Sequence, residues 1–501
     1  MHGVPVVPPA PATLPSTIRR CPPRVLVVGD ALLDSWISGP VHRVGRDAPV
    51  PVVEPNSTRS APGGAANVAA NLAALGARVE LAAVFGDDPD GRALRRALRG
   101  SGVGLDRSVV ELGRPTTAKH RLVAAGQPVA RYDTVAPSPP CRSSDLALAD
   151  AVTEAVHAGV DAVVVADYGL GTLGPRVRRR LARARSGIAL LVVDAHDPGR
   201  WVALAPDAVT PSMAEAAELL GEPVPHGDRV AWGAARGTAL AAATGAAEVL
   251  LTLDVDGALR LPASGEAPGR RPAAHAVADA LACGAGDTFT AAWTVAACAG
   301  ATGGQALACA QAAADVVVAQ PGTAVCSADA LTAHLAAADR GRVLSRSDLL
   351  CAVAEHRRSG HRVVFTNGCF DVLHRGHVAY LRQARALGDV LVVALNSDAS
   401  VSRLKGPERP LNPLEDRAGV VGAVDAVDLV TSFDADTPVD LIEQVRPEVY
   451  AKGGDYTAQM LPETPVVERL GGQVQVLSYL SDHSTTAIVA RIRSADREGA
   501  R

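Results

Sequence analysis

Aromatic residues are scarce in this chain. Of its 501 residues only 3% are Phe, Trp or Tyr, whereas 48% are hydrophobic, so Ala, Val and Leu supply most of the apolar side chains. Proteins that bind single-stranded nucleic acid commonly stack its bases on aromatic rings. The net charge of −4 also provides no broad positive field for a nucleic acid or an acidic membrane surface. We therefore expect neither partner.

Paired cysteines, long apolar runs and a secretory signal are also missing. The eight cysteines form no CxxC pair and no Cys/His cluster, which argues against disulfides and structural zinc and favours a reducing compartment. Residues 291–319 are the most apolar long stretch, but polar residues and glycines interrupt it, so it predicts no membrane span. In residues 1–23 the basic residues follow the apolar ones, the wrong order for a signal peptide. We expect a disordered leader and a cytoplasmic protein.

Two series of short β-branched runs alternate with Ala- and Leu-rich helical stretches. Buried strands separated by helices are typical of parallel sheets that are covered on both faces, so we predict an α/β fold. The boundary between the two series predicts domains at residues 24–340 and 341–501. The first series is RVLVVGD, VELAAVFG, VDAVVVADYG, IALLVVDAH and AEVLLTLD, and the second is HRVVFTNGCF, DVLVVALNSD, VDLVTSF, EVYAKGGD and GQVQVLSYL.

A glycine-rich turn precedes an Ala-rich helix in ALACGAGDTFTAAW. The small residues Gly284, Ala285 and Gly286 let backbone N–H groups approach a phosphate, and the helix N-terminus adds partial positive charge. Asp287 follows, where a general base is needed to take the proton from a hydroxyl that attacks a γ-phosphoryl group. Taken alone, GAGD is more simply a tight turn that caps a helix.

Polar residues suited to sugar binding lie near the N-terminus. Asp30 and Asp34 follow the first predicted strand, and Gly63, Gly64 and Asn67 lie at the start of a helix. Short carboxylates and an amide in such positions can hydrogen-bond several hydroxyl groups. Each residue alone fits a turn or a cap equally well, but together they form an ordered pattern.

Six motifs occur in a fixed order between residues 24 and 330: GDALLD, GGAANVA, PTTAKHRL, VADYG, TPSMAEAAEL and CGAGDTF. In this order they resemble the ribokinase/PfkB family of sugar kinases, which implies a ribokinase-like fold. The resemblance further implies a base at Asp287, an anion hole at residues 284–286, sugar contacts at Asp34, Gly64 and Asn67, and Glu215 in an Asn-x-x-Glu motif that organises magnesium and phosphate.

Three positions depart from the family pattern. The Asp that usually lies six positions before the base, in a monovalent-cation site, is Leu281 here, and the Asn of Asn-x-x-Glu is Ser212. The Lys that commonly follows the Asp-Tyr pair in the closest branch is also missing, because Gly169 and Leu170 follow Tyr168. A decayed kinase domain, used only for binding sugar phosphate or for dimerisation, is therefore an alternative.

The stretch VVFTNGCFDVLHRGHVAYLRQARALGD is the most informative of the chain. A β-branched strand ends in a polar turn, and His374 and His377 then begin an amphipathic helix, where an anion is favoured. Two imidazoles aimed at one phosphate can stabilise a pentacoordinate transition state without a covalent nucleophile. The alternatives are two surface histidines or a metal pair, for which the sequence supplies no further ligands, and we assign no residue to a metal.

Together with NSDASVSRLKGPERPLNPLEDR, AKGGDY and HSTTAIVARI, this stretch resembles the HxGH nucleotidyltransferases over residues 344–494. The resemblance implies a Rossmann-like fold in which His374 and His377 bind the nucleotide phosphates. Taken alone, Lys452 fits a solvated loop. The remaining nucleotide contacts implied are Thr366, Asn367, Lys405, Lys452, Ser484, Thr485 and Thr486, with Arg409 approaching the sugar phosphate.

A sugar kinase followed by an HxGH domain resembles the bifunctional kinase/adenylyltransferases of ADP-heptose biosynthesis. The resemblance implies that ATP phosphorylates heptose 7-phosphate at O1, and that AMP is then transferred from ATP to heptose 1-phosphate with release of pyrophosphate. Both reactions need Mg²⁺ to bridge phosphate oxygens. Related kinases suggest a homodimer by analogy. The alternative is the same architecture acting on another sugar phosphate or nucleotide.

Overall fold

The chain divides into two compact units, residues 1–335 and 336–501. The computed structural model describes residues 4–477 except residues 12, 47, 137, 226, 275–282, 321, 340–341 and 455–456. The division falls within helix α10 (Ala328–Asp339), a few residues before the predicted boundary at residue 340.

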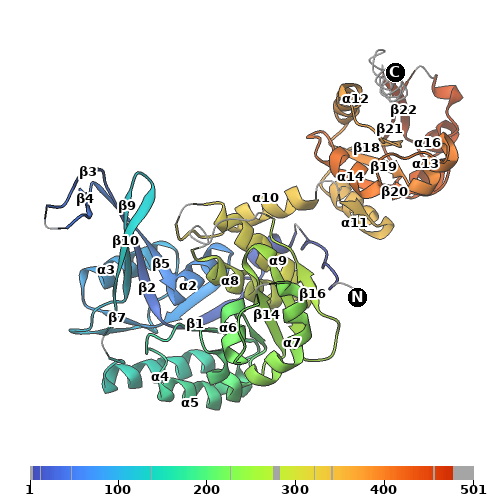
Figure 1. Cartoon of the computed structure of the whole chain (residues 1–501). Coiled ribbons are helices and arrows are strands. Elements are labelled where there is room, and N and C mark those ends of the chain that lie inside the picture. The colour runs from blue at the N-terminus through green and yellow to red at the C-terminus, as the bar shows by residue number, and fades with distance from the viewer. Residues whose placement is uncertain are drawn as a thin grey trace. The chain divides into compact units, whose positions relative to one another are not determined.

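An eight-stranded sheet forms the centre of the first unit, in the order β16-β15-β14-β13-β12-β11-β1-β6 (Figure 1). Its strands run parallel from β14 to β6, and β15 and β16 add an antiparallel edge. Strand β11 is buried along its whole length, and β1 is buried from Val25 to Gly29, because helices cover both faces. The strands are β1 (Arg24–Gly29), β6 (Arg78–Ala82), β11 (Ala162–Asp167), β12 (Leu191–Ala195), β13 (Ala208–Val209), β14 (Glu248–Thr252), β15 (Ala258–Pro262) and β16 (Gly269–Arg271).

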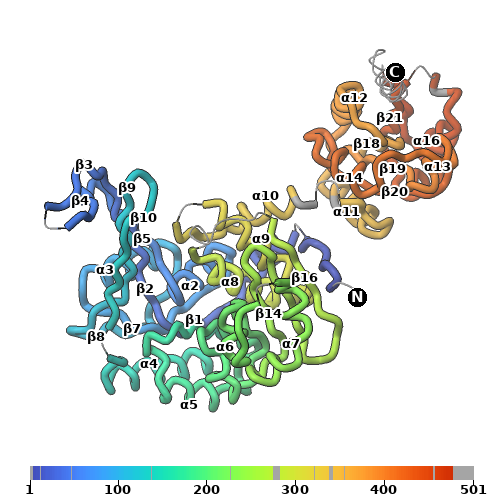
Figure 2. The backbone as a smooth tube through the Cα atoms, viewed as in Figure 1, coloured from blue at the N-terminus to red at the C-terminus, as the bar shows by residue number. Residues whose placement is uncertain are grey.

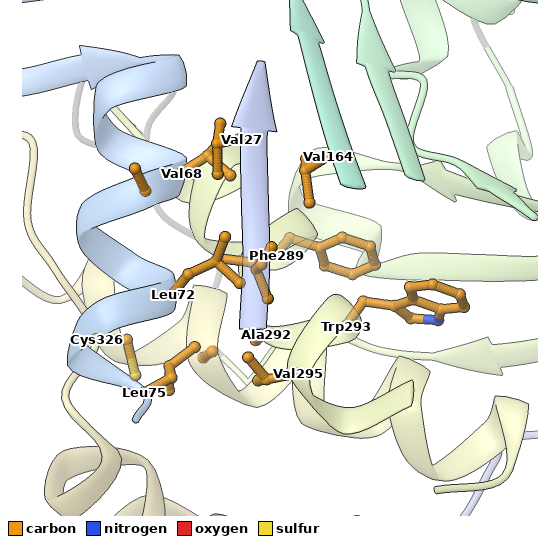
Figure 3. Close-up of a cluster of buried hydrophobic side chains, with 14 of the residues drawn as sticks. Val27, Val68, Leu72, Leu75, Val164, Phe289, Ala292, Trp293, Val295 and Cys326 are labelled. Atoms are coloured by element: carbon orange, nitrogen blue, oxygen red, sulfur yellow. The ribbon is translucent and has the colours of Figure 1, made fainter. Parts of the chain in front are cut away.

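Two groups of helices cover the two faces of this sheet. Figure 3 shows how Leu72 of α2, Val27 of β1 and Phe289 of α8 converge on one apolar cluster. The helices α4, α5 and α7 contribute to a separate cluster against the other face. The helices of the unit are α1 (Leu14–Arg20), α2 (Ala65–Ala74), α3 (Pro89–Gly100), α4 (Arg142–His157), α5 (Pro175–Ala184), α6 (Met213–Leu219), α7 (Arg229–Thr244), α8 (Ala285–Cys298) and α9 (Gly303–Val318).

A four-stranded sheet in the order β10-β9-β2-β5 projects from the first unit (Figure 1). Strand β2 continues directly from β1 after the single residue Asp30. The sequence pattern does not predict this sheet, because β10 is exposed along nearly its whole length and carries no apolar alternation. The strands are β2 (Ala31–Ser38), β5 (Ser57–Gly64), β9 (Ala118–Ala124) and β10 (Gln127–Thr134), accompanied by the pairs β3 (Val41–Val44) with β4 (Pro51–Val53) and β7 (Val84–Gly86) with β8 (Val109–Glu111).

The N-terminal segment is folded over its described residues, so the prediction of a disordered leader is wrong there. Val6 forms a bridge with Arg270 of β16, and Figure 2 traces the segment beside that strand. In α1 the side chains of Leu14 and Ile18 are buried in the core of the first unit. Residues four apart share one helix face. The pattern is short and lies among prolines, so it did not predict a helix.

The second unit contains a six-stranded parallel sheet in the order β17-β20-β19-β18-β21-β22. After the central strand β18 the chain adds strands first on one side and then on the other, so the strand order reverses at β18, the position where ligands bind in open α/β sheets. The strands are β17 (Val343–Leu344), β18 (Val363–Gly368), β19 (Val390–Asn396), β20 (Leu429–Phe433), β21 (Val449–Gly453) and β22 (Gln473–Leu477), and the helices are α11 (Arg346–Arg358), α12 (Arg375–Arg385), α13 (Asp398–Lys405), α14 (Leu414–Gly422), α15 (Val439–Val445) and α16 (Thr464–Arg469).

Every run predicted as a strand contains one in the structure, and both sheets are parallel where the runs predicted it. The predicted α/β fold class is therefore confirmed. Among the residues that the structure describes, no helix is long and apolar enough to cross a membrane.

Candidate active sites

Asp287 lies in the first turn of α8, directly after the glycine-rich turn. Asn67 Nδ2 donates a hydrogen bond to Asp287 Oδ2 at 2.8 Å, and the Tyr168 hydroxyl lies 2.7 Å from Oδ1. Burial raises the pKa of Asp287 to about 6, although these hydrogen bonds oppose the shift. The carboxyl is therefore ionised at neutral pH and has the pKa expected of a general base that acts there.

The glycine-rich turn opens onto a cavity of about 250 Å³. Gly284 has a φ of +80°, and a Cβ there would lie 2.6 Å from the amide nitrogen of Asn67, so the turn requires glycine. Ala285, Gly286 and Ser212 all line the cavity. Two residues of the predicted anion hole and Ser212, at the Asn position of the Asn-x-x-Glu motif, thus meet at one cavity beside a helix N-terminus.

Glu215 and Ser212 form a capping box at the start of α6. The Glu215 carboxylate accepts from the Ser212 backbone N–H at 2.8 Å and lies 2.6 Å from His196 Nδ1. Burial alone would raise the pKa of Glu215, but the hydrogen bonds from His196 and Ser212 outweigh it and lower the pKa. Ser212 therefore caps the start of α6, as the Asn of Asn-x-x-Glu would.

Asp34 lies on β2 and is buried. Arg121 Nη1 of β9 donates to it at 2.7 Å, and Thr323 Oγ1 donates at 3.0 Å. A Cβ at Gly63 would lie 2.6 Å from the Asp34 carboxylate, so glycine is needed for this approach. Arg121 was not predicted as a site residue, although it is the Arg of the quoted motif PTTAKHRL.

Asp30 is placed behind the site, and the structure corrects its prediction as a sugar contact. The side chain is 1% exposed and accepts backbone N–H groups of Tyr168, Leu170 and Thr172 at 3.0 to 3.1 Å. Gly64 lies against the same loop, because a Cβ there would be 3.0 Å from the Tyr168 ring. Both residues fix the loop after β11. Asn67, also predicted as a sugar contact, is fully buried and bonds the base instead.

His374 and His377 lie side by side at the start of α12. Their rings stack with centroids 3.9 Å apart, and the backbone N–H of Gly376 donates to His374 Nδ1 at 3.1 Å. Burial lowers the pKa of His377 to about 4, helped by the positive charges of His374 and Lys405. His377 is therefore neutral at pH 7 and can donate one hydrogen bond to a phosphate. Lys405 is exposed at the end of α13.

Asn367 and Lys452 come together at the carboxyl ends of β18 and β21. Lys452 Nζ donates to Asn367 Oδ1 at 2.9 Å, and the Tyr450 hydroxyl donates to the same oxygen at 2.8 Å. Burial lowers the pKa of Lys452. The side chain is thus partly enclosed beside the sheet rather than solvated in a loop, and Tyr450 is a neighbour that sequence reasoning missed.

Thr366 and Arg409 are placed differently from their predictions. Thr366 is fully buried, and its hydroxyl lies 2.6 Å from the Tyr380 hydroxyl, so it joins β18 to α12. Arg409 is paired with the buried carboxylate of Asp371. These partners indicate that both residues hold the loops of the site together. In the structure both side chains bond protein groups where a nucleotide or sugar phosphate was predicted.

Arg417 is a residue of the second unit that sequence reasoning missed. It is 2% exposed, and its guanidinium donates to the carbonyl oxygens of Cys369 at 2.6 Å and Asn396 at 2.9 Å. It also donates to Asp398 Oδ1 at 2.7 Å. The available signal was the Arg of NPLEDR, but nothing in the motif showed that it ties together the ends of β18 and β19.

We expect Arg417→Met to destabilise the second unit by about 3 kcal/mol, because it leaves buried carbonyl groups without donors. Urea unfolding monitored by hydrogen exchange in β18 and β19 measures the loss. Arg403→Met is the matched control, since the Arg403 ion pair with Asp436 is exposed and such pairs contribute less than about 1 kcal/mol. Equal stability of the two variants would contradict the assignment.

Some predicted residues lie outside those that the structure describes, namely Leu281, Ser484, Thr485 and Thr486. Among the described residues, no group of three or more His, Cys, Asp and Glu side chains could hold a metal ion.

The two units match two different protein families. Residues 23–330 match the pfkB family carbohydrate kinases, and residues 365–491 match the cytidylyltransferase-like family. The Bifunctional protein HldE of Azotobacter vinelandii is 40% identical over 474 residues, which cover 94% of this chain and 97% of the relative. The Bifunctional protein HldE of Alcanivorax borkumensis is 41% identical over 486 residues, 94% of this chain and 98% of the relative.

The chain belongs to the HldE family. Membership in this family, with a pfkB kinase domain and a cytidylyltransferase-like domain, confirms the predicted bifunctional sugar kinase and nucleotidyltransferase. The first unit of this chain also has the fold of a solved structure, the Arabidopsis thaliana ribokinase complexed with ribose and ATP. That structure superimposes with a TM-score of 0.50 at 22% identity, over 63% of this chain and 99% of the ribokinase.

Proposed function

We propose that this chain makes two ATP-dependent steps of ADP-heptose biosynthesis. The first unit phosphorylates D-glycero-β-D-manno-heptose 7-phosphate at O1, and the second transfers AMP from ATP to heptose 1-phosphate with release of pyrophosphate. The observation that carries the proposal is similarity to the HldE proteins along 94% of the chain, together with a base in one unit and a neutral imidazole donor in the other.

In the kinase step the O1 hydroxyl of the sugar attacks the γ-phosphorus of ATP. The new O–P bond forms as the bond to the bridging oxygen breaks, ADP leaves with the electron pair, and Asp287 takes the hydroxyl proton. The backbone N–H groups of residues 284–286 support the charge of the transferred phosphoryl group. Lys119 lowers the pKa of Asp287, and Lys119 and Arg121 bring positive charge to the sugar side, which suits a phosphorylated sugar.

When bound with ATP, Mg²⁺ would neutralise negative charge on the phosphates. The described residues contain no protein cage for it, and Mg²⁺ in such sites is held mainly by phosphates and water with few carboxylates. Glu215, beside the cavity residue Ser212, fits the part of such a carboxylate.

In the transfer step a phosphate oxygen of heptose 1-phosphate attacks the α-phosphorus of ATP. A new O–P bond forms, the bond to the β-phosphate breaks, and pyrophosphate leaves with the electron pair. His377 and His374 donate to the phosphates, and Lys452 adds positive charge near the end of β18. No protein nucleophile takes part.

The test is direct synthesis by the purified protein with ATP, Mg²⁺ and heptose 7-phosphate. We expect the 1,7-bisphosphate in ³¹P NMR spectra, and ADP-heptose with pyrophosphate once a phosphatase specific for the 7-position is added. Nucleotide sugar from heptose 1-phosphate without any bisphosphate would favour the decayed kinase. Consumption of another sugar phosphate, or of CTP instead of ATP, would favour the alternative of a different substrate.

The kinase kcat is expected to fall about tenfold for each pH unit below about 6, because a base must be ionised and the pKa of Asp287 is about 6. Saturating sugar is used, since phosphate esters themselves titrate near pH 6. Thermal unfolding measured from pH 5 to 7 is the control, because it shows whether the kinase unit stays folded over this range. A kinase kcat that is flat down to pH 5 would contradict the assignment.

We also propose a homodimer, by analogy with related sugar kinases, and a cytoplasmic location, from the cysteine pattern. Light scattering on the purified protein measures the dimer.

A further inference from the structure

The hydroxyl group of Tyr168 lies between two carboxyl groups. It is 2.7 Å from Asp194 Oδ2 and 2.7 Å from Asp287 Oδ1. The three side chains come from three elements, because Tyr168 follows β11, Asp194 is near the end of β12 and Asp287 begins α8. This arrangement was not assigned by any motif, and the base chemistry described above does not use Asp194.

A phenolic hydroxyl has one proton and can donate it to only one of the two carboxyl groups. The second short contact is a hydrogen bond only if that carboxyl group is itself protonated and donates to the phenolic oxygen. Asp287 also accepts from Asn67 at 2.8 Å, which favours its ionised form. The proton therefore belongs on Asp194, and the donors run from Asp194 to Tyr168 to Asp287.

The surroundings of Asp194 agree with this order. Burial raises the pKa of Asp194 to about 7, with the negative charges of Asp287 and Glu215 contributing, although hydrogen bonds from Tyr168 and Thr210 oppose the shift. The charges of Asp34 and Lys119 act on the base, where Asp34 raises the pKa of Asp287 and Lys119 lowers it. No cation that the structure describes makes an ion pair with Asp194.

The Tyr168 ring is fixed on several sides. Its backbone N–H donates to Asp30 Oδ2 at 3.0 Å, and its ring meets the edge of the His196 ring with centroids 5.4 Å apart. A Cβ at Gly64 would lie 3.0 Å from Tyr168 Cε2, so the ring rests against a glycine. The hydroxyl can therefore hold the carboxylate of Asp287 in one orientation.

We propose that Tyr168 is a positioning residue for the base Asp287, and that Asp194 holds Tyr168 in place as a neutral, protonated carboxylic acid. The inference rests on the proposed kinase function. Tyr168 and Asp194 exchange no proton with the substrate. The Tyr168 hydroxyl, held by Asp194, donates a hydrogen bond to Oδ1 of Asp287. The carboxylate then presents its remaining lone pairs to the sugar hydroxyl.

The first test is Tyr168→Phe, which keeps the ring and removes the donor. We expect the kinase kcat to fall about tenfold with the KM for sugar changed less than about threefold, because the base is misoriented rather than the sugar site lost. The acid limb of the kcat profile should also move to higher pH, since Asp287 loses a hydrogen bond that lowers its pKa. Tyr132→Phe, at an exposed tyrosine of β10, is the matched control.

The second test compares Asp194→Asn with Asp194→Ala. The asparagine Nδ2 donates to the Tyr168 oxygen as a protonated carboxyl does, so we expect Asp194→Asn to keep the kinase kcat within about twofold at pH 7, whereas Asp194→Ala lowers it about fivefold. Loss of activity in Asp194→Asn equal to that in Asp194→Ala would overturn the proposal, because it would show that Asp194 acts as an anion.

Thermal unfolding and ATP binding of each variant show whether the kinase unit is folded. An unfolded Tyr168→Phe protein would leave the Asp194→Asn and Asp194→Ala comparison to decide. Failure of the proposed function is distinguishable, since it would appear as a wild-type protein that forms no bisphosphate. A wild type that forms bisphosphate, with Tyr168→Phe equal to it in kcat and pH profile, would refute the positioning role alone.

Discussion

Replacing Asp287 by alanine is expected to lower the kinase kcat by about 10³-fold and to leave nucleotidyl transfer unchanged. General-base catalysis contributes about 10²- to 10⁴-fold, and no other carboxylate begins α8 to replace it. The loss should appear in kcat rather than in the KM for sugar, because the anion hole and the Asp34 site remain. Bisphosphate formation followed by ³¹P NMR measures the effect.

Asp150→Ala is the matched control for Asp287→Ala, because Asp150 is an exposed carboxylate paired with Arg180 on α5. It should retain both activities. If Asp287→Ala kept more than about a tenth of the kinase rate, the base would lie elsewhere, since less than tenfold is below what a general base contributes. An equal loss of nucleotidyl transfer would instead indicate general damage to the chain.

Replacing His377 by alanine is expected to lower the rate of nucleotidyl transfer by about 10²- to 10³-fold and to spare the kinase. One donor that stabilises charge at a transition state contributes this much, and a buried neutral imidazole offers such a donor. Pyrophosphate release from ATP and heptose 1-phosphate measures the reaction. His377→Asn should recover part of the rate, since its amide can still donate.

His356→Ala in α11 serves as the control, because that half-buried imidazole lies outside the site and its ring is hydrogen-bonded to that of His361. Full transfer activity in His377→Ala would show that the stacked pair at α12 does not act on the phosphates. A loss in both reactions would contradict the separation of the two sites.

The parallel sheets and the two motif-bearing helix starts could be predicted from the sequence for a clear physical reason. A strand buried on both faces must be apolar throughout, so β1, β11 and β19 stand out as continuous runs. A phosphate turn likewise needs small residues at fixed spacing, as at Gly284 with its φ of +80°. Both signals are local in the sequence.

Long-range partners could not be predicted in the same way. Asp30 looked like a sugar ligand because it follows a strand, but its oxygens accept from backbone groups about 140 positions later. Arg417 shows the same limit, since its acceptors lie on β18 and β19 loops that only folding brings together. A carboxylate or guanidinium can serve a site or a loop equally well, and only its partners decide which.

The folded N-terminal segment has a practical consequence for dividing this enzyme into separate halves. The kinase family match begins at residue 23, so trimming the chain there would look safe. Such a cut would remove the buried side chains of Leu14 and Ile18, each of which contributes about 2 kcal/mol by leaving water. A free-standing kinase half should therefore begin before Val6, and a fusion partner belongs ahead of that residue.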